Sequence, residues 1–283
     1  MKLSMEKISQ QHYSGERALF ASKELELEDC SFADGESPLK ESRDLELKNC
    51  TFEWKYPLWY CKNVKMEESE LKETARSGIW YTDNIDVSRC KIDAPKIFRR
   101  SSKIQVSETH FNKADETLWQ CQNVRLYVVE AKGDYFGYQC EDVQADNLII
   151  HGNYLFDSGK NITIRNSYLE SKDAFWNCEN VTLINCVIIG EYLGWNTKNL
   201  TLINCKIESH QGLCYVDGLK MYRCEVYHSD LILEYSKGID AEIITVVDSI
   251  KNPSEGKIVI AGVKELILDR KYINPSKVKI IRQ

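Results

Sequence analysis

Aromatic side chains recur along this chain at intervals of about 19 residues, a regular spacing that suits ligand binding. They stand five residues before the first apolar residue of each repeat. We call this set the aromatic column, and its members are Phe20, Lys40, Trp59, Trp80, Arg99, Trp119, Tyr138, Asp157, Trp176, Trp195 and Cys214. Such rings can stack on the flat faces of an extended carbohydrate or pack against a protein partner. The predicted binding residues are Trp59, Trp80, Arg99, Trp119, Tyr138, Trp176 and Trp195.

The charged members indicate which way the aromatic column faces. Lys40, Arg99 and Asp157 would be costly in a narrow apolar core, so we predict that the column faces outward. The polar residues that follow it are able to hydrogen-bond a ligand, and they are Tyr60, Tyr81, Arg100, Gln120, Gln139, Asn177, Asn196 and Tyr215. Other interpretations stay open: a loop or the C-terminal tail covers the rings, the rings turn partly inward, or the column is an association surface.

Carboxylates at equivalent places in adjacent repeats raise the possibility of catalysis. Asp115 and Asp134 are such a pair, with Glu116 and Asp157 expected nearby. Carboxyl groups about 5 Å apart suit a retaining glycosidase, and a wider pair suits an inverting one. If the protein is an enzyme, Asp115, Asp134 and Asp157 are its candidate catalytic residues. A chain with 43 acidic residues also stacks some of them by chance, so the pattern does not decide whether there is an enzyme.

Cysteine and histidine give no support for a metal site. The 11 cysteines show neither CxxC pairs nor zinc-type spacing with histidine, and the five histidines share no repeat position. We therefore expect no metal and no cofactor. Most cysteines occupy positions that require a small apolar side chain, so we predict buried, reduced thiols stacked as a ladder.

The elements that position these residues are short strands. The segments LELEDCSF, LELKNCTF and LTLINCKI are copies of one repeat, with apolar residues alternating as in a half-buried strand. Cysteine follows at a turn where asparagine recurs, which predicts an asparagine ladder. A third inward position lies six residues before the first apolar one. This pattern predicts an all-β, single-stranded parallel β-helix of about 11–12 coils with three short strands per coil.

The repeat leaves no composition break at which to divide the chain. We predict one domain over residues 1–283, with an N-terminal cap at 1–16 and regular coils over 17–245. Residues 246–283, which include DSIKNPSEGK, are predicted to form an irregular C-terminal coil or cap.

Several segments carry a family resemblance. The stretches DGESPLKESRDLELKNCTF, YPLWYCKNV, KDAFWNCENVTLINC, GEYLGWNTKNLTLINCKI and DSIKNPSEGK resemble an uncharacterised family of bacterial right-handed β-helix proteins with a pectate-lyase-like fold. The resemblance covers nearly the whole chain and implies right-handed coils. It implies no activity, because that family has no assigned catalytic residues.

Charge and hydropathy exclude some classes of partner. Acidic and basic residues are mixed along the chain with a net charge of −6, so no basic stripe exists for nucleic acid. No apolar stretch is long enough for a membrane span or a secretory signal, and we expect a cytoplasmic protein. The leading hypothesis is a non-catalytic binding or scaffold protein whose ligand is an extended carbohydrate or a protein. The alternatives are a lyase or glycoside hydrolase acting on polysaccharides or oligosaccharides, and a self-associating structural rod; the protein is a monomer or a homo-oligomer.

Overall fold

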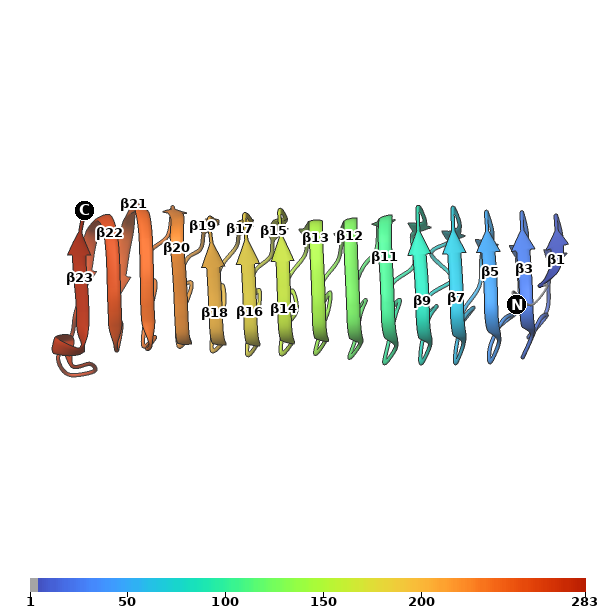
Figure 1. Ribbon diagram of the computed structural model, residues 1–283, viewed down its shortest axis with the longest axis horizontal. Coiled ribbons are helices and arrows are strands. Elements are labelled where there is room, and N and C mark those ends of the chain that lie inside the picture. Colours follow the sequence, from blue (N-terminus) through green and yellow to red (C-terminus); the bar gives the residue numbers. More distant parts are fainter. Residues whose placement is uncertain (1–4) are drawn as a thin grey trace. The chain divides into compact units, whose positions relative to one another are not determined.

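The computed structural model describes residues 5–283, which fall into two compact units, residues 5–142 (unit 1) and 143–283 (unit 2). Both units are parallel β-solenoids (Figure 1). The described residues make about 15 turns of about 19 residues each. Their helical element is a single 3-10 turn, η1 (Pro275–Lys277), and no helix among them is long and apolar enough to cross a membrane.

Unit 1 contains the first twelve strands. They are β1 (Glu6–Ser9), β2 (His12–Tyr13), β3 (Lys23–Glu28), β4 (Ser31–Phe32), β5 (Arg43–Lys48), β6 (Thr51–Phe52), β7 (Lys62–Glu67), β8 (Glu70–Leu71), β9 (Asp83–Ser88), β10 (Lys91–Ile92), β11 (Ser102–Phe111) and β12 (Gln122–Lys132). Equivalent strands of successive turns within the unit pair in parallel. In β3 and β5, for example, Leu25 is opposite Leu45 and Leu27 is opposite Leu47.

Unit 2 contains the remaining strands, of which β13 (Glu141–His151) begins at the end of unit 1. They continue as β14 (Lys160–Arg165), β15 (Tyr168–Glu170), β16 (Glu179–Ile184), β17 (Val187–Ile189), β18 (Lys198–Ile203), β19 (Lys206–Glu208), β20 (Asp217–Tyr227), β21 (Ile239–Lys251), β22 (Gly256–Ile267) and β23 (Val278–Arg282). Their register follows the sequence repeat, since Val181 is opposite Leu200 and Leu183 is opposite Leu202.

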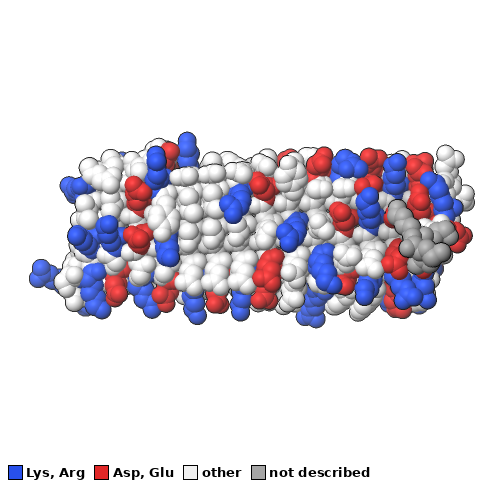
Figure 2. All heavy atoms as spheres, viewed as in Figure 1, with Lys and Arg blue, Asp and Glu red and all other residues white. Residues whose placement is uncertain are grey.

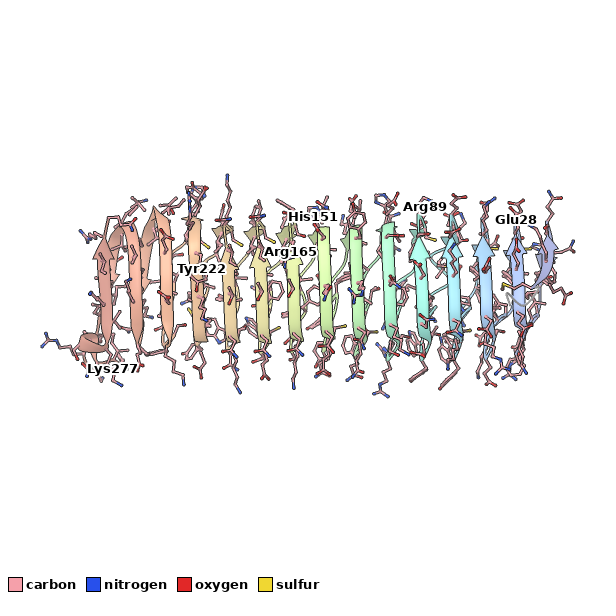
Figure 3. The ribbon with its side chains drawn as sticks, viewed as in Figure 1. Glu28, Arg89, His151, Arg165, Tyr222 and Lys277 are labelled. Carbon is pink, nitrogen blue, oxygen red and sulfur yellow. The ribbon has the colours of Figure 1, made fainter. Side chains whose placement is uncertain are left out.

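Alternation along the strands separates the core from the surface. Inward residues such as Leu27, Phe52 and Leu183 are completely buried. Outward residues are mostly polar or charged, with exceptions such as Ile149 and Tyr222. Lys and Arg are interspersed with Asp and Glu on the face shown in Figure 2, and Arg165 and Tyr222 point out of β14 and β20 in Figure 3. Glu28, also labelled there, accepts ion pairs from Lys7 of the previous turn and Lys48 of the next.

The third predicted strand of each turn is replaced by a tight turn. Between β6 and β7, Tyr56 and Tyr60 adopt positive φ angles of 62° and 57°, which bend the backbone and prevent an extended strand. Hydrogen bonding to the next turn nevertheless continues there, because Leu58 N–H donates to the carbonyl of Gly78 at 2.9 Å. The turns therefore have two strands, such as β3 and β4, or one longer strand, such as β11, rather than three.

Both segments predicted as caps contain further turns of the solenoid. β1 and β2 pair with β3 and β4, although residues 1–4 of the predicted N-terminal cap lie outside the described residues. At the other end β21, β22 and β23 pair in parallel. The structure consequently has about 15 turns rather than about 11–12, because the sequence repeat fades at both ends while the backbone pairing persists.

Side chains bond successive turns in two further ways. All 11 cysteines are free and buried, and several donate to carbonyls of the previous turn, as Cys61 Sγ does to Leu39 at 3.1 Å. Burial raises the pKa of the Cys61 thiol to about 12, so it stays protonated and unreactive near neutrality. On the surface of unit 2, Asn180 Nδ2 donates to Asn161 Oδ1 and Asn199 Nδ2 donates to Asn180 Oδ1, each at 2.9 Å.

Candidate functional site

The aromatic column of unit 1 is a continuous stack of planar groups. Trp59 and Trp80 are parallel, with ring centroids 5.0 Å apart and an interplanar angle of 8°. The guanidinium carbon of Arg99 lies 4.5 Å from the centroid of Trp80 and 5.1 Å from that of Trp119. Trp119 then contacts Tyr138 at 4.2 Å. One turn of the solenoid separates neighbours, so the stacking distance follows from the spacing between parallel strands.

Polar atoms of this stack are largely bonded within unit 1. The indole N–H of Trp59 donates to the carbonyl of Ser77, and that of Trp80 donates to the carbonyl of Lys96 at 2.8 Å. Arg99 Nη2 donates to Glu116 Oε2 at 3.1 Å. Among residues 5–283, Arg99 Nε is the one enclosed side-chain polar atom without a hydrogen-bond partner.

A second row of rings lies beside the stack. Tyr60 and Tyr81 are parallel with centroids 4.7 Å apart, and Tyr60 stands almost perpendicular to Trp59. Tyr60 is 49% exposed, whereas the column residues themselves are half-buried. The column faces outward as predicted, but its inner ring faces are covered by one another. A sugar ring cannot stack on those faces, so unit 1 offers mainly ring edges and hydroxyl groups to a ligand.

The rings of the aromatic column of unit 2 are tilted throughout, as Trp119 and Tyr138 are in unit 1 at 35°, whereas Trp59 and Trp80 are parallel. Trp176 and Trp195 have centroids 6.2 Å apart and an interplanar angle of 42°. Trp195 also meets Tyr215 at 5.1 Å and 37°, and Tyr215 meets Tyr235 at 5.3 Å and 48°. Tyr192 stands edge-on to Trp195 at 5.7 Å. We call these five residues the tilted aromatic surface; tilting leaves ring faces that no neighbour covers in parallel.

Cys214 departs from the prediction for the aromatic column. It is completely buried, and its Sγ donates to the carbonyl of Gln211 at 3.2 Å. A small thiol can turn back into the core where an indole cannot. Tyr215, the next residue, is 43% exposed and takes over the contact with Trp195.

Hydrogen-bonding groups near the tilted aromatic surface are only partly used. The indole N–H of Trp176 donates to the carbonyl of Tyr192 at 3.2 Å. That of Trp195 has no acceptor in the part of the chain that the structure describes. Asn196 Nδ2 donates to Asn177 Oδ1 at 2.9 Å, which leaves the other polar atoms of this exposed pair for a ligand.

The predicted catalytic carboxylates are divided between the two units. Asp115 and Asp134 lie in adjacent turns of unit 1, where Asp115 Oδ1 accepts a hydrogen bond from the backbone N–H of Asp134 at 3.2 Å. The Asp115 carboxylate thus helps to hold the backbone of the next turn. Asp157 belongs to unit 2 and accepts a hydrogen bond from Ser158 Oγ at 2.9 Å. Glu116 lies near this pair, since its backbone N–H donates to the carbonyl of Asp134 at 2.9 Å, and its carboxylate is bonded to Arg99 and Lys96.

Sequence reasoning missed one carboxylate, Asp173. It lies at the place in its turn where Tyr154 and Tyr192 stand in the neighbouring turns, and it is only 3% exposed. A comparison of this position across repeats would have shown that Asp173 stands where the neighbouring repeats have tyrosine. Burial raises the pKa of its carboxyl group; Lys172 opposes that effect, and Glu191 and Asp157 add to it.

A shallow groove in unit 1 lies away from the aromatic column. It has a volume of about 390 Å³ and is lined in part by Asp44, Asn63 and Asn84. These groups bond to one another, because Asn63 Nδ2 donates to Asp44 Oδ1 at 2.7 Å and Asn84 Nδ2 donates to Asn63 Oδ1 at 2.9 Å. Within residues 5–283, no group of three or more His, Cys, Asp or Glu side chains is arranged to hold a metal ion.

With this geometry in view, comparison with known proteins places the chain in a family. A family model described as a protein of unknown function (DUF3737) matches residues 6–281. The chain belongs to this family. The resemblance seen in the sequence is thereby confirmed, as is the parallel β-helix class that it implied. A comparison with curated proteins gave no match.

Three solved structures are similar in fold to this chain. A mutant tailspike protein of E. coli bacteriophage HK620 has 7% identity and a TM-score of 0.42, covering 93% of this chain and 71% of that one. A mannuronan C-5 epimerase A-module from Azotobacter vinelandii has 9% identity and a TM-score of 0.36, covering 98% and 88%. A surface adhesin of Streptococcus pneumoniae has 11% identity and a TM-score of 0.34, covering 97% and 85%. None of these likenesses carries an argument about activity or ligand.

Proposed function

We propose that this member of a family of unknown function is a non-catalytic binding protein for an extended carbohydrate, and that the tilted aromatic surface of unit 2 is its binding site. The observation that carries the proposal is the environment of Trp195. Its ring is tilted against Trp176 and Tyr215, and its indole N–H has no acceptor within residues 5–283. An apolar face beside a free donor is what a sugar ring requires, because the sugar offers C–H groups and hydroxyl oxygens together.

The rings are already held in place before any ligand arrives. Trp176 is fixed by the bond from its indole N–H to Tyr192, and Tyr215 is in contact with rings on both sides. Little conformational freedom is therefore lost on binding, which favours affinity. Successive turns also repeat the rings along the solenoid at roughly 5 Å per turn, so more than one sugar unit of a chain can contact the surface.

The aromatic column of unit 1 supports the assignment by contrast. Trp80 is covered on one side by Trp59 and on the other by Arg99, and its indole N–H is bonded to Lys96. We assign this stack a structural role, because each of its recognition features is already used within the unit. The two columns thus provide a binding residue and a matched control of the same type.

The experiment begins with a glycan array, followed by calorimetric titration of the best oligosaccharide. Trp195→Ala should weaken its affinity tenfold or more, since a buried aromatic contact in a binding site is worth about 2 kcal/mol. Trp80→Ala should lower thermal stability but leave affinity unchanged. Absence of any glycan ligand, or equal affinity of wild type and Trp195→Ala, would contradict the proposal.

A further inference from the structure

In both units, several side chains of the aromatic column reach diagonally to the turn that follows. The indole N–H of Trp80 donates to the carbonyl of Lys96, sixteen residues further on, and that of Trp176 donates to Tyr192 in the same relation. Arg99 makes the equivalent contact through its guanidinium to Glu116, seventeen residues on. In these cases a donor meets an acceptor, so the contact is attractive.

Asp157 breaks this pattern. It occupies the aromatic column one turn before Trp176, and the residue sixteen positions on is Asp173. The backbones of the two turns are in register there, because Tyr154 N–H donates to the carbonyl of Lys172 at 2.8 Å and Phe175 N–H donates to that of Leu155 at 2.8 Å. Side chains in this diagonal relation can be neighbours, since the ring centroids of Trp119 and Tyr135 lie 6.2 Å apart. At Asp157 and Asp173 the relation makes two carboxyl groups neighbours, and the charge of Asp157 acts on Asp173. Such a like-charge pair costs folding energy unless something binds it.

Asp173 itself is a buried carboxylate without a donor. It is 3% exposed, and among the described residues no hydrogen bond to its side chain is present. Its oxygens are not among the enclosed polar atoms that lack a partner, so the carboxylate still touches solvent. The cation beside it, Lys172, is already paired, since its Nζ binds Glu191 at 3.2 Å and lies 5.4 Å from the ring centroid of Tyr192.

Around the Asp173 carboxyl group, acidic side chains outnumber cationic ones. Asp157 and Glu191 raise the pKa of the Asp173 carboxyl group in addition to its burial, and only Lys172 opposes them. Tyr154 and Tyr192 occupy the same place in the turns on either side, and neither brings a cation. A ligand that brings a cation with several N–H donors would satisfy both carboxylates at once.

We propose that Asp157 and Asp173 form a recognition site for the ammonium group of an amine-bearing sugar, whose rings lie on the adjacent tilted aromatic surface. This inference rests on the proposed function and specifies its ligand class. An ammonium group has three donors, enough for the two carboxylates and one sugar or water oxygen. Trp176 follows Asp157 in the aromatic column, so a cation held there also lies close to an indole ring, where cation–π attraction adds to binding. Two carboxylates alone fall short of the six to eight oxygen ligands that Ca²⁺ takes, which favours an organic cation.

Two oligosaccharides that differ only in the amine test this inference. Hexamers of β-1,4-linked glucosamine and of N-acetylglucosamine share one backbone, but acetylation removes the positive charge. Titration calorimetry near neutral pH should show at least tenfold tighter binding of the glucosamine hexamer, and the preference should shrink as salt screens the charges. Asp173→Asn and Asp157→Asn should each remove most of the preference and leave the acetylated hexamer unaffected.

Control variants separate this inference from the proposed function and from misfolding. Asp115→Asn in unit 1 should leave the preference intact, because an asparagine oxygen can still accept the hydrogen bond from Asp134. Circular dichroism and thermal melting should show that the aspartate variants fold. Equal binding of both hexamers, or a preference that survives Asp173→Asn, overturns the ammonium site even if Trp195→Ala still abolishes binding. If neither hexamer binds while a neutral glycan binds through Trp195, the ammonium site is also refuted and the proposed function stands.

Discussion

Arg99 is held between two indole rings in unit 1, and its removal should destabilise that unit by about 1–2 kcal/mol. Each cation–π contact, to Trp80 and to Trp119, is worth about 0.5–1 kcal/mol at a half-buried site. The charged hydrogen bond to Glu116 adds about 1 kcal/mol, since both side chains are less than one third exposed. The enclosed Nε without a partner offsets about 1 kcal/mol of this gain.

The assay is urea unfolding of Arg99→Ala followed by indole fluorescence, because the two rings beside Arg99 report on their own environment. Hydrogen exchange of β9 and β11 should localise the loss of protection to the turns on either side. Arg99→Trp is the informative second variant. A tryptophan there can continue the parallel stack and donate to the carbonyl of Glu116, so it should recover most of the stability lost in Arg99→Ala.

The reasoning would be refuted by an Arg99→Ala protein as stable as wild type with unchanged fluorescence. It would equally fail if Arg99→Trp were less stable than Arg99→Ala, because the column would then not accept a ring at that position. A double-mutant cycle with Glu116→Gln isolates the ion pair, and a coupling energy near zero would assign the whole effect to the rings.

Three further expectations concern the solenoid itself. Gly190→Ala should prevent folding or lower the melting temperature severely, because a Cβ there would lie 2.1 Å from the carbonyl oxygen of Ser171 at a φ of 154°; a soluble, equally stable variant would contradict this. Cys61 ionises near 9.0 when unfolded but near 12 when folded, so stability that is complete below pH 9 should fall as pH rises between those values, by about 1.4 kcal/mol per unit. Urea midpoints from pH 8 to 11 test this, and Cys61→Ala should show a shallower decline. Asn180→Ala should cost about 2 kcal/mol, because it removes hydrogen bonds to both neighbouring turns at a φ of 58°. Asn180→Gly, which tolerates that φ, should cost less, and equal losses would assign the whole effect to the hydrogen bonds.

The sequence predicts the turns of this fold well because the residues that determine strand register and burial recur at the same positions of each repeat. Leu25 and Leu45, or Val181 and Leu200, could be paired by their place in the repeat, and the structure pairs them. The terminal turns were missed because their inward residues no longer repeat, although their backbones pair in the same way. The third strand was mispredicted because an inward residue every turn does not reveal a positive φ angle at its neighbours, such as Tyr56.

The candidate site could be predicted only in outline. Spacing alone places Trp176 and Trp195 on one side of the chain, but it does not give the 42° angle between them, which depends on how each side chain packs. Cys214 also shows that spacing does not give side-chain orientation. Its side chain is small enough to turn inward, so it packs in the core although its position belongs to the aromatic column. Asp173 was overlooked because its importance comes from a diagonal neighbour in another turn, and sequence columns compare only equivalent positions.

The diagonal contact between successive turns also bears on how such a chain finds its correct alignment. Turns built from near-identical repeats could pair one turn out of step with little loss of apolar burial. Arg99 meets Glu116 in only one alignment, and any other would leave the guanidinium and the carboxylate without each other. The Arg99–Glu116 pair therefore specifies the alignment of successive turns during folding of unit 1. Replacing Arg99 should increase the yield of misaligned, slowly refolding chains.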